Sequence, residues 1–330
     1  MKIVIDSAIP FVKGVFEPYC CVEYLEADAF TRQRIDGADA LLIRTRTHCN
    51  RELLEGSSVR HIATATIGFD HIDLEYCRKR GIEVSSAAGC NARAVLQWIG
   101  AVLVQLSKKG GWSPKQKTLG VVGLGNVGSL VARYAALWGF KVLSCDPPRQ
   151  AKEGGDFVPF EQLAAQSDLI TFHVPLDSST RHMIDPESLE VIAPHCTIIN
   201  SSRGEVVSTE AILRAGNPFV MDVWESEPEL NGEALEKALF ATPHVAGYSL
   251  QGKANATMMA VRSIAQALGL PLTSWRSEVP QVEPREISWE ELQTTIGKYF
   301  DIESQSSFLK SNAPLFEHIR NNYDYREEYF

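Results

Sequence analysis

KTLGVVGLGNVGSLVARYAALWGFKVLSCD, residues 117–146, contains the pattern around which the rest of the chain is arranged. A short apolar run leads into the glycine pattern Gly123-Leu-Gly125-Asn-Val-Gly128, and a second apolar run ends at Asp146. This order predicts a strand, a glycine turn, a helix and a second strand, as in a dinucleotide-binding unit of the Rossmann type. Gly139 is expected to end the helix, because glycine readily adopts a left-handed conformation. The apolar face of that helix is expected to comprise Val127, Leu130, Val131, Tyr134, Leu137 and Trp138.

Each glycine of the turn has a physical task. Gly123 allows a tight turn, Gly125 lets a pyrophosphate approach the backbone, and Gly128 lets the helix and the strand pack closely. The phosphates would accept hydrogen bonds from unpaired N–H groups at the helix N-terminus. We therefore expect the turn to bind a dinucleotide through Gly123, Gly125, Asn126, Val127 and Gly128.

Asp146 distinguishes between NAD and NADP. It lies 18 residues after Gly128, where a carboxylate can bind the ribose hydroxyls and would repel a 2′-phosphate. Arg149 could instead accommodate that phosphate. Because Pro147 and Pro148 stiffen the intervening chain, we discount Arg149 and predict NAD.

The composition is that of an ordinary globular enzyme, with 330 residues, 45% of them hydrophobic and 22% charged. A formal net charge of −9 argues against a nucleic-acid partner. The longest nearly apolar stretch, residues 94–106, is too short to cross a bilayer. Seven cysteines without a CxxC pair suit a reducing cytoplasm.

The first 90 residues alternate apolar runs with helical patterns, which predicts a small parallel α/β layer. Strands are expected at residues 3–5, 22–25, 40–43, 62–65 and 82–84, and helices near residues 8–17, 50–56 and 73–80. Asp70-His71-Ile-Asp73 superficially resembles a set of metal ligands. A carboxylate at the start of a helix explains it better, so we predict no metal site.

Two of these strands end in polar residues, and ligands of parallel sheets bind beyond such ends. One is followed by Arg44-Thr45-Arg46, and the other by Thr66. The two guanidinium groups could bind a phosphate, because their paired donors match its oxygens. They could equally be solvated surface charges.

A long apolar helix is predicted from Asn91 to Lys109, followed by strands at residues 169–172, 197–200 and 219–222. Residues 275–288 contain Pro280 and Pro284 among charges and predict a linker. The tail, 289–330, has two short helical patterns that are too small to form a core. They must pack on the body of the chain or on another subunit, and we favour a dimer contact.

A nicotinamide only carries a hydride, so the protein must supply a base and an anchor for the substrate. Arg203 follows a predicted strand and could hold a substrate carboxylate, although a structural ion pair is the alternative. His244 lies in a turn between Pro243 and Gly247, and imidazole suits proton removal from an alcohol. Either Glu225 or Glu227 could bind the other ring nitrogen, and spacing does not separate them.

Of the remaining histidines, His173 ends a strand and is expected to line the cofactor pocket with Val174 and Pro175. His61, His182, His195 and His318 lack such a setting, and a surface or capping role is expected for each.

The ordered motifs GLGNVG, CDPP, SSRG, DVWESEP and PHVAGYS resemble the D-isomer-specific 2-hydroxyacid dehydrogenases over nearly the whole of the first 270 residues. The resemblance implies a catalytic arginine, glutamate and histidine. These carry over to Arg203, Glu227 and His244, so that the family pattern selects Glu227 over Glu225.

Further stretches, such as ATATIGFDH at residues 63–71 and HVAGYSLQGK at residues 244–253, resemble family members that act on a phosphorylated substrate. This resemblance implies substrate contacts at Thr45, Thr66 and Tyr248, and a tail that forms a homodimer. It also implies NAD contacts at Asp146, Ser201, Ser202, Arg203, Asp222, His244 and Gly247.

The fold implied is α/β, with a Rossmann-type NAD-binding domain at residues 92–250 and a flavodoxin-like α/β substrate domain. The substrate domain is discontinuous, residues 1–91 and 251–275, because the chain returns to it through a helix at residues 251–268. Residues 276–330 would form a linker and a small C-terminal dimerisation segment.

The sequence therefore predicts an NAD-dependent dehydrogenase of a small phosphorylated 2-hydroxy acid, without nucleic-acid or membrane partners. One alternative is a dehydrogenase of the same family that acts on 3-phosphoglycerate, or on glyoxylate and hydroxypyruvate. Another is a non-catalytic NAD-sensing protein, which the intact set of Arg203, Glu227 and His244 disfavours.

Overall fold

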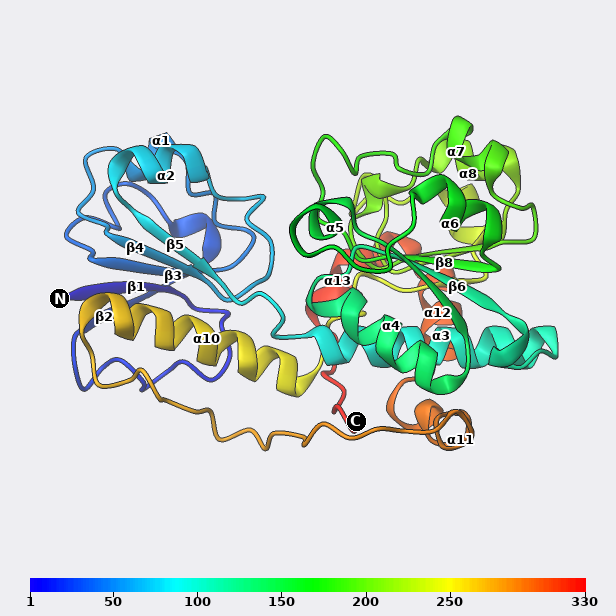
Figure 1. Cartoon of the computed structure of the whole chain (residues 1–330). Coiled ribbons are helices and arrows are strands. Elements are labelled where there is room, and N and C mark those ends of the chain that lie inside the picture. The colour runs from blue at the N-terminus through cyan, green and yellow to red at the C-terminus, as the bar shows by residue number, and fades with distance from the viewer. The chain divides into compact units, whose positions relative to one another are not determined.

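The computed structural model describes all 330 residues, from Met1 to Phe330. The chain divides into two compact units (Figure 1). The first comprises Met1–Asn91 and Leu250–Gln281, and the second comprises Ala92–Ser249 and Val282–Phe330. The late helix at Leu250 thus belongs with the first unit, and the tail belongs with the second.

The first unit contains a five-stranded, fully parallel sheet of order β2-β1-β3-β4-β5. Its strands are β1 (Lys2–Asp6), β2 (Cys21–Leu25), β3 (Ala40–Ile43), β4 (His61–Thr64) and β5 (Glu83–Ser86). The order 2-1-3-4-5 is that of flavodoxin-like sheets, which confirms the predicted fold of this unit.

Helices cover both faces of this sheet, with α1 and α2 on one face and α10 on the other (Figure 1). Their bounds are α1 (Arg51–Leu54), α2 (Leu74–Arg80) and α10 (Leu250–Leu268), and a 3₁₀ turn, η1, spans Ala27–Ala29. Ile3 and Ile5 pack toward α10, whereas Val4 between them packs toward α1 and α2. Burial on both faces explains why these strands read as continuous apolar runs. Asp73 begins α2 by accepting the Tyr76 N–H, as predicted.

The second unit contains a six-stranded parallel sheet of order β11-β10-β9-β8-β6-β7. Its strands are β6 (Thr118–Val122), β7 (Lys141–Cys145), β8 (Leu169–Phe172), β9 (Thr197–Asn200), β10 (Phe219–Met221) and β11 (Phe240–Ala241). From β6 the chain moves first to β7 on one side and then to β8 on the other. The glycine turn after β6 therefore lies where the direction of winding reverses, and ligands bind at that point of such sheets.

The helices of the second unit begin with the long buried α3. Their bounds are α3 (Ala92–Gly110), α4 (Asn126–Trp138), α5 (Pro147–Glu153), α6 (Phe160–Gln166), α7 (Pro186–Val191), α8 (Thr209–Ala215) and α9 (Gly232–Lys237), with 3₁₀ turns η2 (Pro114–Gln116) and η3 (Gly204–Val206). Gly139 ends α4 in the left-handed conformation at φ 101°, as expected.

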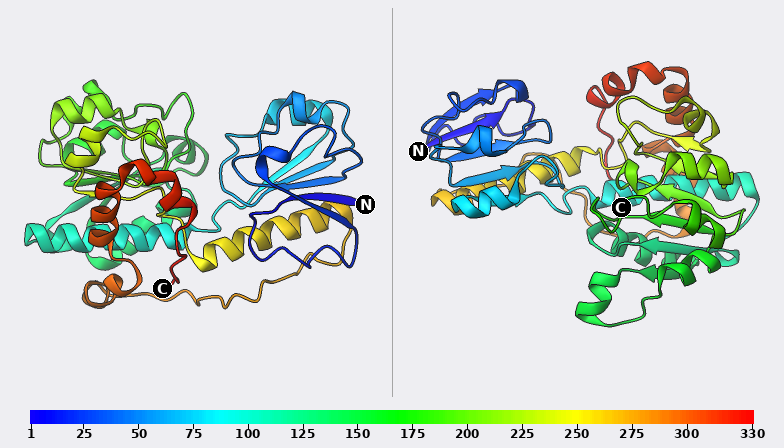
Figure 2. Two further views of the ribbon diagram at one scale, coloured as in Figure 1. Left: turned by 180° about the vertical axis from the view of Figure 1, so that it is seen from behind. Right: turned by 90° about the horizontal axis from the view of Figure 1, so that it is seen from above.

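The tail packs on the second unit of its own chain (Figure 2). It contains α11 (Trp289–Tyr299), α12 (Ile302–Ser311), η4 (Ala313–Leu315) and α13 (Phe316–Asn321). Trp289 and Leu292 of α11 join the apolar core around α3 and α4. Ser306 of α12 accepts the Ala241 N–H of the edge strand β11 at 3.0 Å. The final residue, Phe330, is fully buried in the same core.

Three expectations from the sequence are wrong, and one helix was not expected. Residues 8–17 form turns rather than a helix, and Phe11 there has a left-handed φ of 62°. Leu137 is 44% exposed although it lies on the predicted apolar face of α4. The polar helix α12 was not predicted, because only three of its residues are buried. His61 is buried at the start of β4 and contacts Ser85 and Ser263, rather than lying at the surface.

Candidate active site

The glycine turn between β6 and α4 packs so closely that side chains would not fit at two of its positions. A Cβ at Gly123, whose φ is +84°, would lie 2.6 Å from the His173 carbonyl oxygen. A Cβ at Gly128 would lie 1.8 Å from the Gly123 oxygen. A Cβ at Gly125 would have no atom within 4 Å, so the backbone there faces open space. This is the arrangement that a pyrophosphate requires at the start of α4.

Asp146 follows β7 and is fixed beside the turn. One of its carboxylate oxygens accepts the Leu124 N–H at 2.7 Å, and the other accepts the Arg149 N–H at 2.9 Å. The Arg149 guanidinium donates to the Leu124 carbonyl, to Ser129 and to Glu153, at 2.7–2.9 Å. The Arg149 guanidinium is thus engaged by groups of the protein rather than held ready for a 2′-phosphate, which favours NAD over NADP.

The end of β8 contacts the glycine turn, as a Cβ at Gly123 would also meet Val174. Burial lowers the pKa of His173 to about 3, so its imidazole is neutral at physiological pH. The Nε2 atom of His173 lies 3.2 Å from the Thr171 hydroxyl. His173 and Val174 therefore lie against the turn, and Pro175 follows them in the chain.

The loop after β9 carries Ser201, Ser202 and Arg203. Asn200 folds this loop, because its side-chain oxygen accepts the N–H and the hydroxyl of Ser202 and its amide donates to the Arg203 carbonyl at 2.8 Å. The Ser201 hydroxyl is buried and has no hydrogen-bond partner in the protein, which leaves it available to a bound group. An orphaned hydroxyl of this kind fits the predicted cofactor contact.

The Arg203 loop lies against the loop that follows β10. A Cβ at Gly204 would lie 2.1 Å from the Trp224 backbone, so only glycine permits this approach. The Arg203 guanidinium donates to the Ser202 carbonyl at 2.9 Å. The close approach brings Arg203 near the segment that leads to Glu227.

Glu227 and His244 form a hydrogen-bonded pair. The His244 Nδ1 atom lies 2.8 Å from one carboxylate oxygen of Glu227, and the other oxygen accepts the Trp224 N–H at 2.9 Å. Burial raises the pKa of the Glu227 carboxyl, but His244 and Arg320 together hold it below its ordinary value. Glu227 is therefore an ionised partner for the imidazole at neutral pH.

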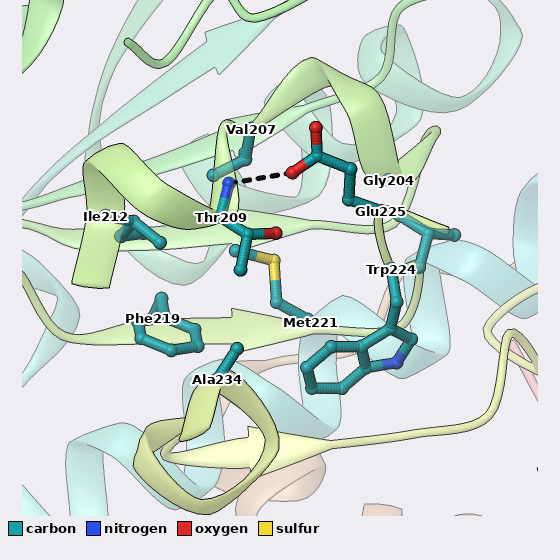
Figure 3. A pocket seen from close by; sticks show the side chains of 10 residues that line it. Gly204, Val207, Thr209, Ile212, Phe219, Met221, Trp224, Glu225 and Ala234 are labelled. Carbon is teal, nitrogen blue, oxygen red and sulfur yellow. Dashed lines mark hydrogen bonds between the residues drawn. The ribbon is translucent and has the colours of Figure 1, made fainter. Parts of the chain in front are cut away.

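The structure also separates Glu227 from Glu225, which spacing could not do. Glu225 accepts from His182 Nε2 at 2.8 Å and from the Thr209 N–H at 3.0 Å. Figure 3 shows Glu225 directed toward Thr209, beside a small cavity lined mainly by apolar side chains. Glu225 thus stabilises the start of α8, and its hydrogen-bond partners are His182 and Thr209 rather than His244.

The buried carboxylate of Asp222 shapes the loop that carries His244. Asp222 is 1% exposed and accepts the Thr242 hydroxyl at 2.6 Å, the Val245 N–H at 2.8 Å and the Ala246 N–H at 2.9 Å. The Asp222 carbonyl accepts the His244 N–H at 2.7 Å, and His244 has a left-handed φ of 59°. Burial raises the pKa of the Asp222 carboxyl, whereas the charge of His244 and these hydrogen bonds act to lower it.

The remaining predicted residues lie in two places. Arg44, Thr45, Arg46 and Thr66 follow β3 and β4 of the first unit, where Arg44 donates weakly to the Ala8 carbonyl at 3.4 Å. Gly247 and Tyr248 follow His244 in the second unit. Tyr248 packs edge-on against Tyr323 and Tyr325 of the tail, with ring centroids 6.0 and 6.1 Å away.

Sequence reasoning missed two charged residues beside these sites. Asp6 ends β1, next to β3, and is 2% exposed. Burial raises its pKa, while the charges of Arg44 and Arg46 oppose the rise. Its position at the end of a strand was the available signal. Arg320 of the tail lies 3.5 Å from Glu227, and no local pattern marks it.

Comparison with known proteins also indicates an NAD-binding dehydrogenase. The family model described as "D-isomer specific 2-hydroxyacid dehydrogenase, NAD binding domain" matches residues 94–246. The chain is 45% identical to the erythronate-4-phosphate dehydrogenase of Bacteroides thetaiotaomicron, over 99% of this chain and 97% of that protein. It is 40% identical to the protein of the same name from Porphyromonas gingivalis, over 86% of this chain and 80% of that one.

Solved structures share the fold. An NAD⁺-bound 3-phosphoglycerate dehydrogenase of Entamoeba histolytica is 26% identical, with a TM-score of 0.69 over 86% of this chain and 99% of that one. A D-lactate dehydrogenase of Aquifex aeolicus, in complex with NAD and lactic acid, has a TM-score of 0.66 at 24% identity, over 85% of this chain and 100% of that one. No helix of the present chain is both long and apolar enough to span a membrane.

Proposed function

This chain belongs to the D-isomer-specific 2-hydroxyacid dehydrogenase family, and we propose that it oxidises 4-phospho-D-erythronate to (R)-3-hydroxy-2-oxo-4-phosphooxybutanoate in pyridoxal 5′-phosphate biosynthesis. It is an NAD-dependent dehydrogenase. The substrate is supported by the name that its relatives share at 40–45% identity. A cytoplasmic location is supported by its seven free cysteines, since a reducing compartment keeps thiols unpaired.

The observation that carries the proposal is the 2.8 Å contact between His244 Nδ1 and Glu227. An ionised carboxylate at Nδ1 selects the tautomer with its proton on that nitrogen, which leaves Nε2 as the acceptor. His244 Nε2 then removes the proton of the C2 hydroxyl. Because the pKa of Glu227 is lowered, the carboxylate stays ionised throughout the neutral range and supports the imidazole as it gains charge.

Arg203 binds the substrate carboxylate in this proposal. A guanidinium fork fixes both carboxylate oxygens and orients C2, which places the hydroxyl toward the base. When bound, NAD⁺ accepts the hydride that leaves C2. The glycine turn, Asp146 and the Ser201–Arg203 loop hold it, and the open backbone at Gly125 and the orphaned Ser201 hydroxyl fit that role.

Arg44 and Arg46 bind the substrate phosphate in this proposal. They follow β3 in a parallel sheet, at the edge where ligands of such sheets bind. The buried Asp6 ends the adjacent strand β1; burial raises its pKa, and the positive charges of Arg44 and Arg46 oppose that rise, which places the two guanidinium groups near this carboxyl. Thr45 and Thr66 at the same edge, and Tyr248 in the second unit, are the remaining substrate contacts.

We further propose that two copies associate through the tail. Phe308 and Leu315 of the tail are 54% and 49% exposed, although neighbouring apolar residues of α12 and α13 are buried. Exposed apolar side chains that are close in sequence favour a protein contact.

The central test replaces His244 with glutamine. Glutamine cannot act as a base, so we expect kcat for 4-phospho-D-erythronate to fall by roughly 10²–10⁴-fold while NADH still binds. A panel of 2-hydroxy acids, including 3-phosphoglycerate, is followed at 340 nm for NADH production, and NADH binding is measured by fluorescence. If the unaltered protein binds NADH but oxidises no acid, it is a sensor; if it prefers 3-phosphoglycerate, the substrate assignment is wrong.

The phosphate assignment is tested with the double variant Arg44→Ala/Arg46→Ala. Removal of both guanidinium groups should raise KM for the phosphorylated acid at least tenfold more than KM for an unphosphorylated 2-hydroxy acid, because only the former loses charged hydrogen bonds. Arg60→Ala is the matched control, since Arg60 forms a surface ion pair with Asp39 in the same unit. Equal changes for both acids would refute the assignment.

The tail contact is tested by Phe308→Asp/Leu315→Asp. Two carboxylates in an apolar contact leave unpaired charges, so we expect the sedimentation mass to fall from that of a dimer to that of one chain. Leu137→Asp, at a position that is 44% exposed on α4, should leave the mass unchanged. A variant that remains dimeric, or an unaltered protein that sediments as a monomer, would contradict this proposal.

A further inference from the structure

Helix α13 of the tail brings a positive charge to the Glu227–His244 pair. Arg320 Nη1 lies 3.5 Å from the Glu227 Oε2 atom, and the same oxygen lies 2.8 Å from His244 Nδ1. One carboxylate oxygen is therefore shared by an imidazole and a guanidinium. The other oxygen accepts the Trp224 N–H, so both oxygens of Glu227 are engaged.

This contact is partly shielded from solvent. The Arg320 and Glu227 side chains are 27% and 17% exposed. Burial opposes a charge on Arg320, but the neighbouring Tyr248 and Glu227 raise its pKa above the ordinary value, so the guanidinium stays charged. Charges at this depth are screened less than those of a fully solvated pair.

The chain just beyond Arg320 is fastened to the loop that carries His244. The guanidinium of Arg326 is buried and donates to the carbonyls of Val245, Ala246 and Tyr248 in that loop. It lies 4.6 Å from the centre of the Phe300 ring. Glu328 then accepts the Ser249 hydroxyl at 2.6 Å. The tail and the histidine loop thus form one packed structure, which fixes Arg320 relative to His244.

We propose that Arg320 is a positioning residue of the reaction, which holds Glu227 in line with His244. The inference rests on the proposed function, because it concerns the base of that reaction. It assigns to the tail a task within its own chain, independent of whether two copies associate.

The sign of the effect follows from the charges around the pair. Glu227 is negative and attracts positive charge at His244, Arg320 is positive and offsets that attraction, and Tyr248 faces Arg320. The buried carboxyl of Asp222, whose pKa burial raises, also faces His244. The neutral imidazole is the form that accepts a proton from the substrate. Loss of the Arg320 charge should therefore move the acid limb of kcat/KM to higher pH.

The test compares Arg320→Gln and Arg320→Lys in full pH profiles of kcat/KM for 4-phospho-D-erythronate. We expect Arg320→Gln to move the acid limb of the kcat/KM profile to higher pH by roughly 0.5–1 unit and to lower the plateau value of kcat/KM several-fold, with NADH affinity unchanged. Arg320→Lys keeps the charge and should restore most of the limb position. Arg133→Gln, which removes an exposed arginine paired with Glu286, should leave the profile unmoved.

A double-mutant cycle shows whether Arg320 acts through Glu227. The decrease in the plateau value of kcat/KM caused by Arg320→Gln should nearly vanish in a Glu227→Gln background, because that background already lacks the contact between Arg320 and the Glu227 carboxylate. A plateau loss that is equal in both backgrounds, or a lowered melting temperature with an unmoved acid limb, would overturn the inference and leave Arg320 a structural residue. An unaltered protein that turns over no acid would refute the proposed function and the inference together.

Discussion

The hydrogen bond between Glu227 and His244 depends on a buried carboxylate two residues before Trp224. Asp222 directly follows β10 and binds the loop that follows the neighbouring strand β11, through the Thr242 hydroxyl and two backbone N–H groups. A buried carboxylate is costly unless it is hydrogen bonded, so the loop has little freedom to leave this arrangement. Parallel strands place their carboxyl ends at one edge, and Asp222 joins two of those ends into one site.

The tail completes this site from the opposite end of the chain. Phe330 is buried against α3 and α4, and its main-chain oxygen accepts from Arg93 at 2.9 Å and from Gln97 at 3.3 Å. Arg326 binds the carbonyls of the histidine loop, and Arg320 reaches Glu227. Residues of the tail thus hold a loop that lies about 80 positions earlier in the chain, so the tail is part of the structure that fixes this loop.

The sequence predicted the features that are local. The glycine turn, Asp146 and the strands are encoded by spacing and periodicity over a few tens of residues, and the structure has them at those places. It did not predict Arg320, Arg326 or Asp6, because their roles depend on partners distant in sequence. Helix α12 was not predicted, because its few buried residues give a weak apolar pattern. Leu137 was wrongly assigned to the buried face of α4, because the buried stripe of this helix is narrower than the run of apolar residues in its sequence. Glu225 and Glu227 show the same limit of spacing: the family resemblance selected Glu227, and the fold then directs Glu225 to His182 and Glu227 to His244.

The most direct test of the account is the protonation of the His244 ring, read by ¹H–¹⁵N NMR of histidine-labelled protein with and without Glu227→Gln. A neutral imidazole with its proton on Nδ1, shared with Glu227, and a bare Nε2 is the state that the account predicts. The Nδ1 proton should move upfield in the Glu227→Gln variant, because a neutral acceptor binds it less strongly. A proton on Nε2 in the neutral ring of the unaltered protein would contradict the assignment of His244 as the base.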